Sequence, residues 1–258
     1  MRNQSSGTGV SEPELTSARK RAESEFLQDA LCTWVKLSIE LDGVKSPRAK
    51  SPGTFTYLSL CNAMVLNSIL LYIDVRPTRP DVVHYVRDVP TRLKNLSILL
   101  SNIQSFYQDV LGQIITMPLP DLLTIARNPY PDESGQEMKK ILLLLLGCAV
   151  QSEKKEEFIN LIKQLEVPLQ HAIAEQIKKV TSDVDCVLNI QALELNPEDA
   201  VTARVLQQLQ RVVKERDSLA QNVLDLHQES EGSDSGGSQS SGSSGELYNH
   251  KLPESQQH

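Results

Sequence analysis

The chain has 258 residues, of which 40% are hydrophobic, and a formal net charge of −7. This length is enough for one sizeable core plus appendages. The longest apolar run, over 141–150, is about half of the roughly 20 residues that cross a bilayer, which predicts no membrane span. Residues 24–182 contain 17 basic and 17 acidic side chains, so they lack the positive field that attracts nucleic acids. No apolar signal segment follows the N-terminus, which predicts a cytosolic protein.

The first half of the chain predicts helices separated by Pro- and Gly-containing turns. Residues 1–23 show no periodicity and are expected to form a disordered arm. Apolar side chains at helical spacing predict helices over 24–39, 57–73 and 93–111, with a loop over 44–54 that contains two Ser-Pro steps. A short helix over 122–125 and a turn at 128–131 follow. Ser134 and Glu137 then have the spacing of a capping box, which predicts that the next helix starts at Ser134.

The next helix, 138–151, is apolar on every side between 141 and 146, so it is expected to be buried or covered by a partner. Helices over 153–165 and 168–181 follow it. No segment shows sustained period-two alternation, so the predicted fold is all-α, with about eight helices. Gly147 is unusual because glycine inside a helix costs about 1 kcal/mol relative to alanine. It either permits close packing or lets the helix open into two pieces.

Two compatible interpretations exist for helix 138–151. It is a central core helix, or it forms with the following helix a hydrophobic groove for an amphipathic helix of a partner. One face can be core while the other is groove. The expected groove residues are Leu143, Leu146, Gly147, Val150, Phe158 and Ile159.

The last predicted helix begins after Asn196-Pro197-Glu198 and carries apolar residues that alternate by four and three. That spacing is typical of a coiled-coil seam, although Arg216 occupies one seam position. We expect residues 196–228 to start a parallel coiled coil that forms a homodimer, followed by a disordered Ser/Gly-rich tail over 229–258. The seam residues are Val205, Leu209, Val212, Leu219, Val223 and Leu226.

Residue patterns of enzymes and metal sites are missing from the sequence. There is no phosphate-binding glycine loop, nucleophile elbow or HExxH motif, and no histidine has a second ligand three or four residues away. The cysteines Cys32, Cys61, Cys148 and Cys186 lie far apart beside apolar residues, which predicts reduced core thiols. We therefore expect no catalytic, cofactor-binding or metal site.

Several segments resemble Hook-type domains of the Hook, Girdin and Daple family, most of all those of Girdin and Daple. The most distinctive is ILLLLLGCAVQSEKKEEFI at 141–159. Others are YID at 72–74, RPT at 76–78, RLKNL at 92–96, FYQDVL at 106–111, LPDLL at 119–123 and AIAEQIKKVT at 172–181. The resemblance covers residues 24–195 and the start of the coiled coil, in order and with conserved spacing.

The resemblance implies a calponin-homology-like helical bundle with a C-terminal helical extension, leading into a dimeric coiled coil. It also implies a cytoplasmic adaptor, associated with microtubules or the centrosome, that binds a helix of the dynein light intermediate chain. By position, Val150 corresponds to an apolar groove residue of the Hook adaptors, which carry glutamine where this chain has Leu143. The alternative is direct binding to acidic microtubules, which would need a basic face formed from Lys45, Arg48, Lys50, Arg76, Arg79, Arg87, Arg92 and Lys94.

Overall fold

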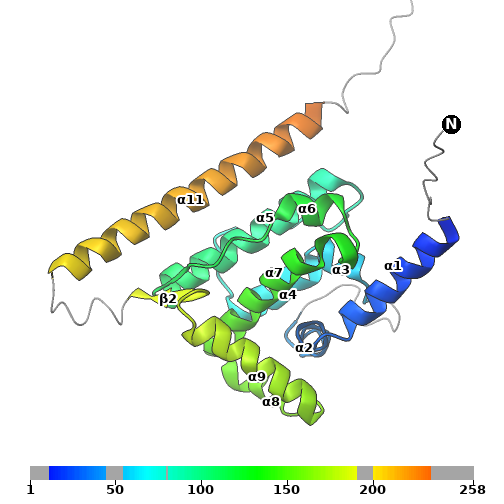
Figure 1. Cartoon of the computed structure of the whole chain (residues 1–258), viewed down its shortest axis with the longest axis horizontal. Coiled ribbons are helices and arrows are strands. Elements are labelled where there is room, and N and C mark those ends of the chain that lie inside the picture. The colour runs from blue at the N-terminus through cyan, green and yellow to red at the C-terminus, as the bar shows by residue number, and fades with distance from the viewer. Residues whose placement is uncertain (1–11, 45–54, 80, 191–199, 234–258) are drawn as a thin grey trace, which may run out of the picture.

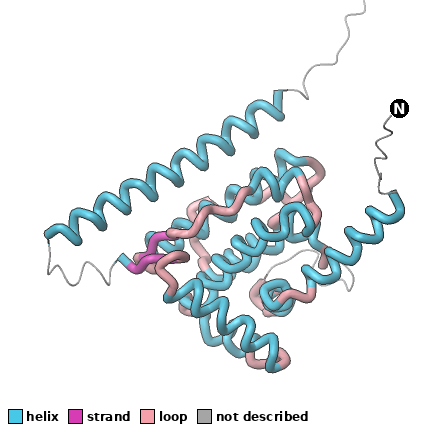
Figure 2. The backbone as a smooth tube through the Cα atoms, in the orientation of Figure 1, coloured by secondary structure: helices cyan, strands magenta, loops and turns pink. Residues whose placement is uncertain are grey.

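A computed structural model of the chain describes residues 12–44, 55–79, 81–190 and 200–233. Helix α7 (Pro131–Gln151) lies at the centre, and the other helices of the bundle pack around it (Figure 1). Every residue of α7 from 141 to 149 is buried. The all-α prediction is confirmed, apart from one short pair of strands (Figure 2). The calponin-homology-like arrangement stays a prediction.

The N-terminal part is more ordered than expected. Helix α1 (Glu12–Leu27) includes residues 12–23, so the predicted disorder is wrong there, whereas residues 1–11 lie outside the described residues. Tertiary contacts hold α1 against α7: the Arg19 guanidinium lies 3.9 Å from the centre of the Tyr130 ring and pairs with Glu133 at 3.2 Å. These anchors are polar, so the apolar periodicity of the sequence did not reveal them.

Two predicted helices are each divided in the structure. The predicted helix 24–39 is interrupted before α2 (Ala30–Ser38), where the Asp29 carboxylate accepts a hydrogen bond from the Leu31 amide at 3.0 Å. The predicted helix 57–73 is divided into α3 (Tyr57–Cys61) and α4 (Met64–Ile73) by Ala63, whose φ of 57° is left-handed. Asn95 on the next helix supports this break by donating to the Asn62 carbonyl at 3.2 Å.

Helix α5 (Val89–Ser105) begins earlier than predicted because Asp88 caps it and Pro90 occupies its first turn. It continues into a π-helix, η1 (Phe106–Val110), and then into strand β1 (Gln113–Ile115). β1 pairs antiparallel with β2 (Val187–Asn189), with Ile114 opposite Leu188. Three-residue strands are too short to show alternation, which is why the sequence did not predict them.

The remaining helices agree with the predictions except at their ends. Helix α6 (Leu122–Arg127) is followed by α7, which begins at Pro131 and not at Ser134. The buried Ser134 hydroxyl instead contacts the Tyr57 hydroxyl at 2.8 Å, so the predicted capping box is wrong. Helices α8 (Lys155–Ile162) and α9 (Val167–Ser182) complete the bundle. The prediction of four reduced core thiols is confirmed, since all four are free and buried.

Helix α11 (Ala200–Ser233) lies along α5 and is the longest element (Figure 1). It runs beyond the predicted boundary at residue 228, so residues 229–233 are helical and not part of a disordered tail. Three other predictions fall outside the described residues. They are the loop over 44–54, apart from Val44, the cap at 196–198 and the tail over 234–258.

Candidate partner-binding surfaces

The six predicted groove residues do not form an open groove in this structure. Leu143, Leu146, Gly147 and Phe158 are buried, and the side chains of Leu146 and Phe158 have no exposed surface. Val150 and Ile159 are the two that remain half-exposed. Four of the six positions are therefore inaccessible to solvent in this conformation, because other elements pack on α7 and Phe158 packs against Trp34 and Tyr72.

Gly147 serves close packing in this conformation. The buried Tyr107 hydroxyl of η1 donates to the Leu144 carbonyl of α7 at 3.2 Å. A Cβ atom on residue 147 would lie only 1.9 Å from that hydroxyl oxygen and 2.7 Å from a methyl carbon of Val180. The absence of a side chain at this position is what allows the tyrosine to reach the helix backbone.

An aromatic cluster holds α8 on the bundle. The Phe158 ring packs against Trp34 and Tyr72, with centroid separations of 6.0 Å and 6.1 Å. The Tyr72 hydroxyl donates to the Glu157 carboxylate, and this hydrogen bond raises the pKa of Tyr72 to about 12. The Lys154 ammonium lies 3.4 Å from the centre of the Tyr72 ring. Tyr72 thus contacts the first turn of α8 at two places, Lys154 and Glu157.

The half-exposed Val150 stands where α7 ends. Gln151, the next residue, donates to the Gly147 carbonyl at 3.1 Å and accepts from the Gln113 side chain of β1 at 2.8 Å. Ser152 then ends the helix in extended backbone. The last turn of α7 is therefore fixed by β1, with Val150 packed against the core and still accessible to solvent.

The predicted coiled-coil seam is mostly exposed on α11. Its exposed members have 52–65% of their surface accessible: Val205, Val212, Leu219, Val223 and Leu226. Leu209 is half-buried against the domain. Arg216, which occupies a seam position in the sequence, turns toward the domain instead, where it donates to the Met117 carbonyl at 3.2 Å and pairs with Asp217 at 2.7 Å.

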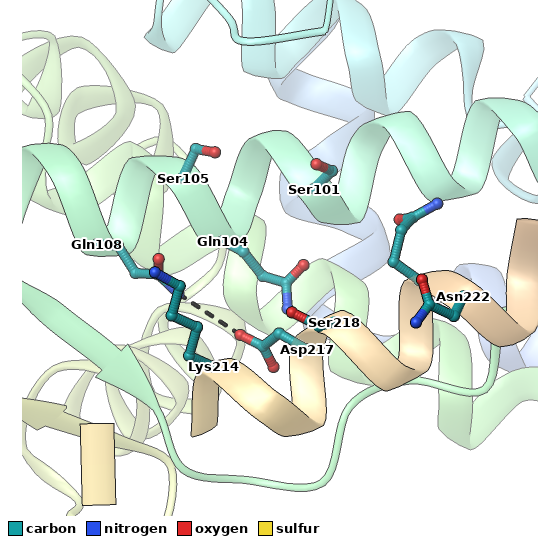
Figure 3. Close-up of a pocket in the computed structure, with 9 residues that line it drawn as sticks. Ser101, Gln104, Ser105, Gln108, Lys214, Asp217, Ser218 and Asn222 are labelled. Carbon is teal, nitrogen blue, oxygen red and sulfur yellow. Dashed lines mark hydrogen bonds between the residues drawn. The ribbon is translucent and has the colours of Figure 1, made fainter. Parts of the chain in front are cut away.

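A second face of α11 contacts the domain, and the sequence analysis missed it. Leu206 and Val213 are buried with Ile114 and Ile190 in a small apolar cluster. Between α5 and the middle of α11 lies a cavity of about 340 Å³ (Figure 3). Its lining is polar: Ser101, Gln104, Ser105, Gln108, Lys214, Asp217, Ser218, Gln221 and Asn222. The sequence does contain a signal for this second face. Leu206 and Val213 are apolar, lie seven residues apart and each directly follow a seam residue.

Only some of the basic residues that direct microtubule binding would need are exposed in the described part of the chain. Lys45, Arg48 and Lys50 lie outside the described residues. The Arg92 guanidinium is engaged with Asn62 and the Ala126 carbonyl, and Arg79 lines a cavity between α4, α5 and the loop 74–88. Arg76, Arg87 and Lys94 are exposed.

Among the described residues, no His, Cys, Asp and Glu side chains gather in groups of three or more that could hold a metal ion. Within the same residues, no helix combines the length and the apolar character needed to span a bilayer.

Residues 84–179 match the family model of the HOOK domain. Daple from Homo sapiens is 41% identical over 210 residues, which cover 79% of this chain and 10% of Daple. Girdin from Mus musculus is 37% identical over 216 residues, which cover 81% of this chain and 11% of Girdin. The solution structure of the conserved domain of mouse HOOK1 is 31% identical and covers 59% of this chain and 91% of that domain, with a TM-score of 0.45. The chain spans about a tenth of the length of Daple and Girdin.

Proposed function

Because the chain belongs to the Hook, Girdin and Daple family through its HOOK domain, we propose that it is a non-enzymatic cytoskeletal adaptor of the cytoplasm. Its domain binds a helix of the dynein light intermediate chain, and α11 pairs two copies as the start of a coiled coil. Such an adaptor acts on microtubules or at the centrosome. Each copy then supplies one helix-binding site, and two linked sites raise the overall avidity.

The observation that carries this proposal is the position of Val150. It is an apolar side chain, half-exposed at the end of the buried central helix, at the position of an apolar groove residue in the Hook adaptors. Ile159, on the neighbouring helix α8, is half-exposed as well. An amphipathic partner helix is expected to contact these two residues first.

Deeper binding requires the elements around α7 to move, because Leu146, Gly147 and Phe158 are covered. Helix α8, which carries Phe158, has eight residues, of which only Phe158 and Ile162 are buried, so few apolar anchors hold it. Moving α8 away from the bundle costs free energy, which reduces the binding free energy by the same amount. The apparent affinity equals the intrinsic affinity multiplied by the fraction of molecules in which α8 is open. A single site is therefore expected to bind weakly, in the micromolar range on the order of −8 kcal/mol.

The test uses the full chain and a labelled peptide of the dynein light intermediate chain helix. Val150→Asp should abolish binding in fluorescence anisotropy while the Tm falls by only a few degrees, since a half-exposed charge keeps most of its hydration. Leu145→Asp, at a buried position of α7, should unfold the domain. Val75→Asp, at a valine that is 69% exposed after α4, is the matched control and should change neither property.

Two outcomes would contradict the assignment. If the Val150→Asp variant stays folded and binds the peptide as tightly as the wild type, Val150 is not part of the binding site. Unfolding of both Val150→Asp and Leu145→Asp would show that Val150 belongs to the core.

A further inference from the structure

Helix α11 carries two apolar stripes, each of which repeats every seven residues. The first stripe consists of Val205, Val212, Leu219 and Leu226, and the second consists of the residues that follow the first three of them: Leu206, Val213 and Ala220. Neighbouring residues on an α-helix point about 100° apart. The two stripes therefore run in parallel along α11 and face different directions.

The structure separates the stripes by burial. Val212 is 58% exposed, whereas its neighbour Val213 is 6% exposed. The same contrast holds between Val205, at 62%, and Leu206, at 8%. The second stripe is thus covered by the domain at Leu206 and Val213 and half-exposed at Ala220, whereas every member of the first stripe is exposed.

The buried stripe holds α11 antiparallel to α5. Near the start of α11, Leu206 and Val213 pack with Ile114 of β1. Further along, Asp217 accepts from Gln108 at 3.5 Å (Figure 3), and Gln221 accepts from the Ser97 hydroxyl at 3.2 Å. The contacts therefore extend over four turns of α11, with apolar packing at one end and polar side chains in the middle.

We propose that α11 binds its own domain through the buried stripe and a second copy of this chain through the exposed stripe at the same time. This inference rests on the proposed coiled-coil dimer. Two domains would then flank a central pair of α11 helices, each fixed to its own helix, and would not hang from a free stalk. A second copy is the occupant that fits, because a strict seven-residue repeat is the pattern by which identical helices pair.

The two contacts are compatible because they use few residues in common. The exposed stripe keeps more than half of its surface accessible to solvent, whereas Leu209 and Arg216, at the boundary between the stripes, contact the domain. Pairing through the exposed stripe alone leaves Leu206 and Val213 in place. An apolar stripe widened beyond the coiled-coil seam is typical of a helix that packs against more than one neighbour.

The test compares two adjacent valines in the full chain. Val212→Asp should make the protein monomeric in sedimentation equilibrium, with a dimer dissociation constant raised at least about tenfold, because it places a charge in the helix pair. Val213→Asp should leave the dimer intact and release α11 from the domain. Release is measured with Gln108→Cys and Asp217→Cys joined by a short bis-maleimide, since Gln108 is exposed, the native pair lies 3.5 Å apart and the four native thiols are buried. The isolated wild-type dimer should give crosslinks within one chain, and Val213→Asp should lose them.

Three outcomes would overturn this inference, and they separate it from the proposed function. A crosslinked protein that is monomeric while the uncrosslinked protein dimerises would show that docking and pairing compete. Crosslinks between two chains would show that α11 docks on the partner's domain. A wild-type protein that stays monomeric at every concentration would also remove the proposed coiled-coil dimer, whereas peptide binding at Val150 would be unaffected.

Discussion

Replacement of Gly147 by alanine tests whether this glycine is required for packing. The added methyl carbon would lie 1.9 Å from the Tyr107 hydroxyl oxygen and 2.7 Å from a Val180 methyl carbon. Both neighbours are fully buried, so neither can swing into solvent. We therefore expect Gly147→Ala to destabilise the domain although alanine is the better helix former.

The magnitude follows from three contributions. Overpacking in a filled core costs about 1–3 kcal/mol. If the tyrosine moves, its hydroxyl loses the Leu144 carbonyl, and an unsatisfied buried hydroxyl costs about 1–3 kcal/mol. Alanine returns about 1 kcal/mol of helix propensity. The free energy of unfolding should fall by roughly 1–5 kcal/mol, and the Tm by about 2–4 °C for each kcal/mol.

Chemical denaturation followed by circular dichroism gives the free energy of unfolding. Tyr107→Phe in the Gly147→Ala background removes the closest contact, so the double variant should lose less than the sum of the two single losses. An alanine variant as stable as the wild type would refute the packing argument. If that stable variant also failed to bind the dynein peptide, Gly147 would instead be a hinge of α7.

Two further predictions concern a helix cap and the thiols. Asp88→Ala should cost about 1 kcal/mol, because the carboxylate accepts from the Thr91 amide at 2.8 Å as the N-cap of α5. Its hydrogen bond from the Thr91 side chain lowers the pKa of Asp88, so this stabilisation is present at neutral pH and is lost in denaturation series as the pH falls below the usual carboxyl pKa. Burial raises the pKa of Cys32 and Cys61 to about 12, so a thiol reagent at pH 8 should react quickly only after denaturant is added; rapid labelling of the native protein would contradict their burial. Because these thiols ionise from about pH 9 in the unfolded chain but only near pH 12 in the folded one, the free energy of unfolding should decrease as the pH rises from about 9 toward 12.

The helices with strong apolar periodicity were predictable, and their interruptions were not. Residues 141–149 are apolar on all sides, and α7 is buried on all sides, as the pattern indicates. The break at Ala63 is supported by a contact from another element, that of Asn95 with the Asn62 carbonyl, whereas the break before Ala30 is capped locally by Asp29, which apolar periodicity does not register. A short sequence window contains no signal for contacts between residues far apart in the chain.

The surfaces were predicted less well than the core, for a related reason. Apolar residues on a helix show which faces avoid water but not what covers each face. Phe158 was expected in a groove and is instead packed against Trp34. Arg216 appeared to be a flaw in the coiled-coil seam, and it instead binds the Met117 carbonyl of the domain. Both differences come from neighbours that are distant in sequence.

The short segment from η1 to β1 connects the two proposed surfaces physically. Tyr107 points to α7 and donates to the Leu144 carbonyl, whereas the adjacent Gln108 points outward and donates to Asp217 of α11. In β1, Gln113 donates to Gln151 beside Val150, and Ile114 packs with Leu206 of α11.

Neighbouring residues of this segment thus serve different helices. The wider turn of a π-helix is a conformation that recurs at functional sites, and here it places consecutive side chains against α7 and α11. Because the sequence FYQDV fits ordinary helical periodicity, only the structure reveals this division. A segment that fixes both the last turn of α7 and the first turns of α11 sets the orientation of the proposed partner site relative to the proposed dimer axis.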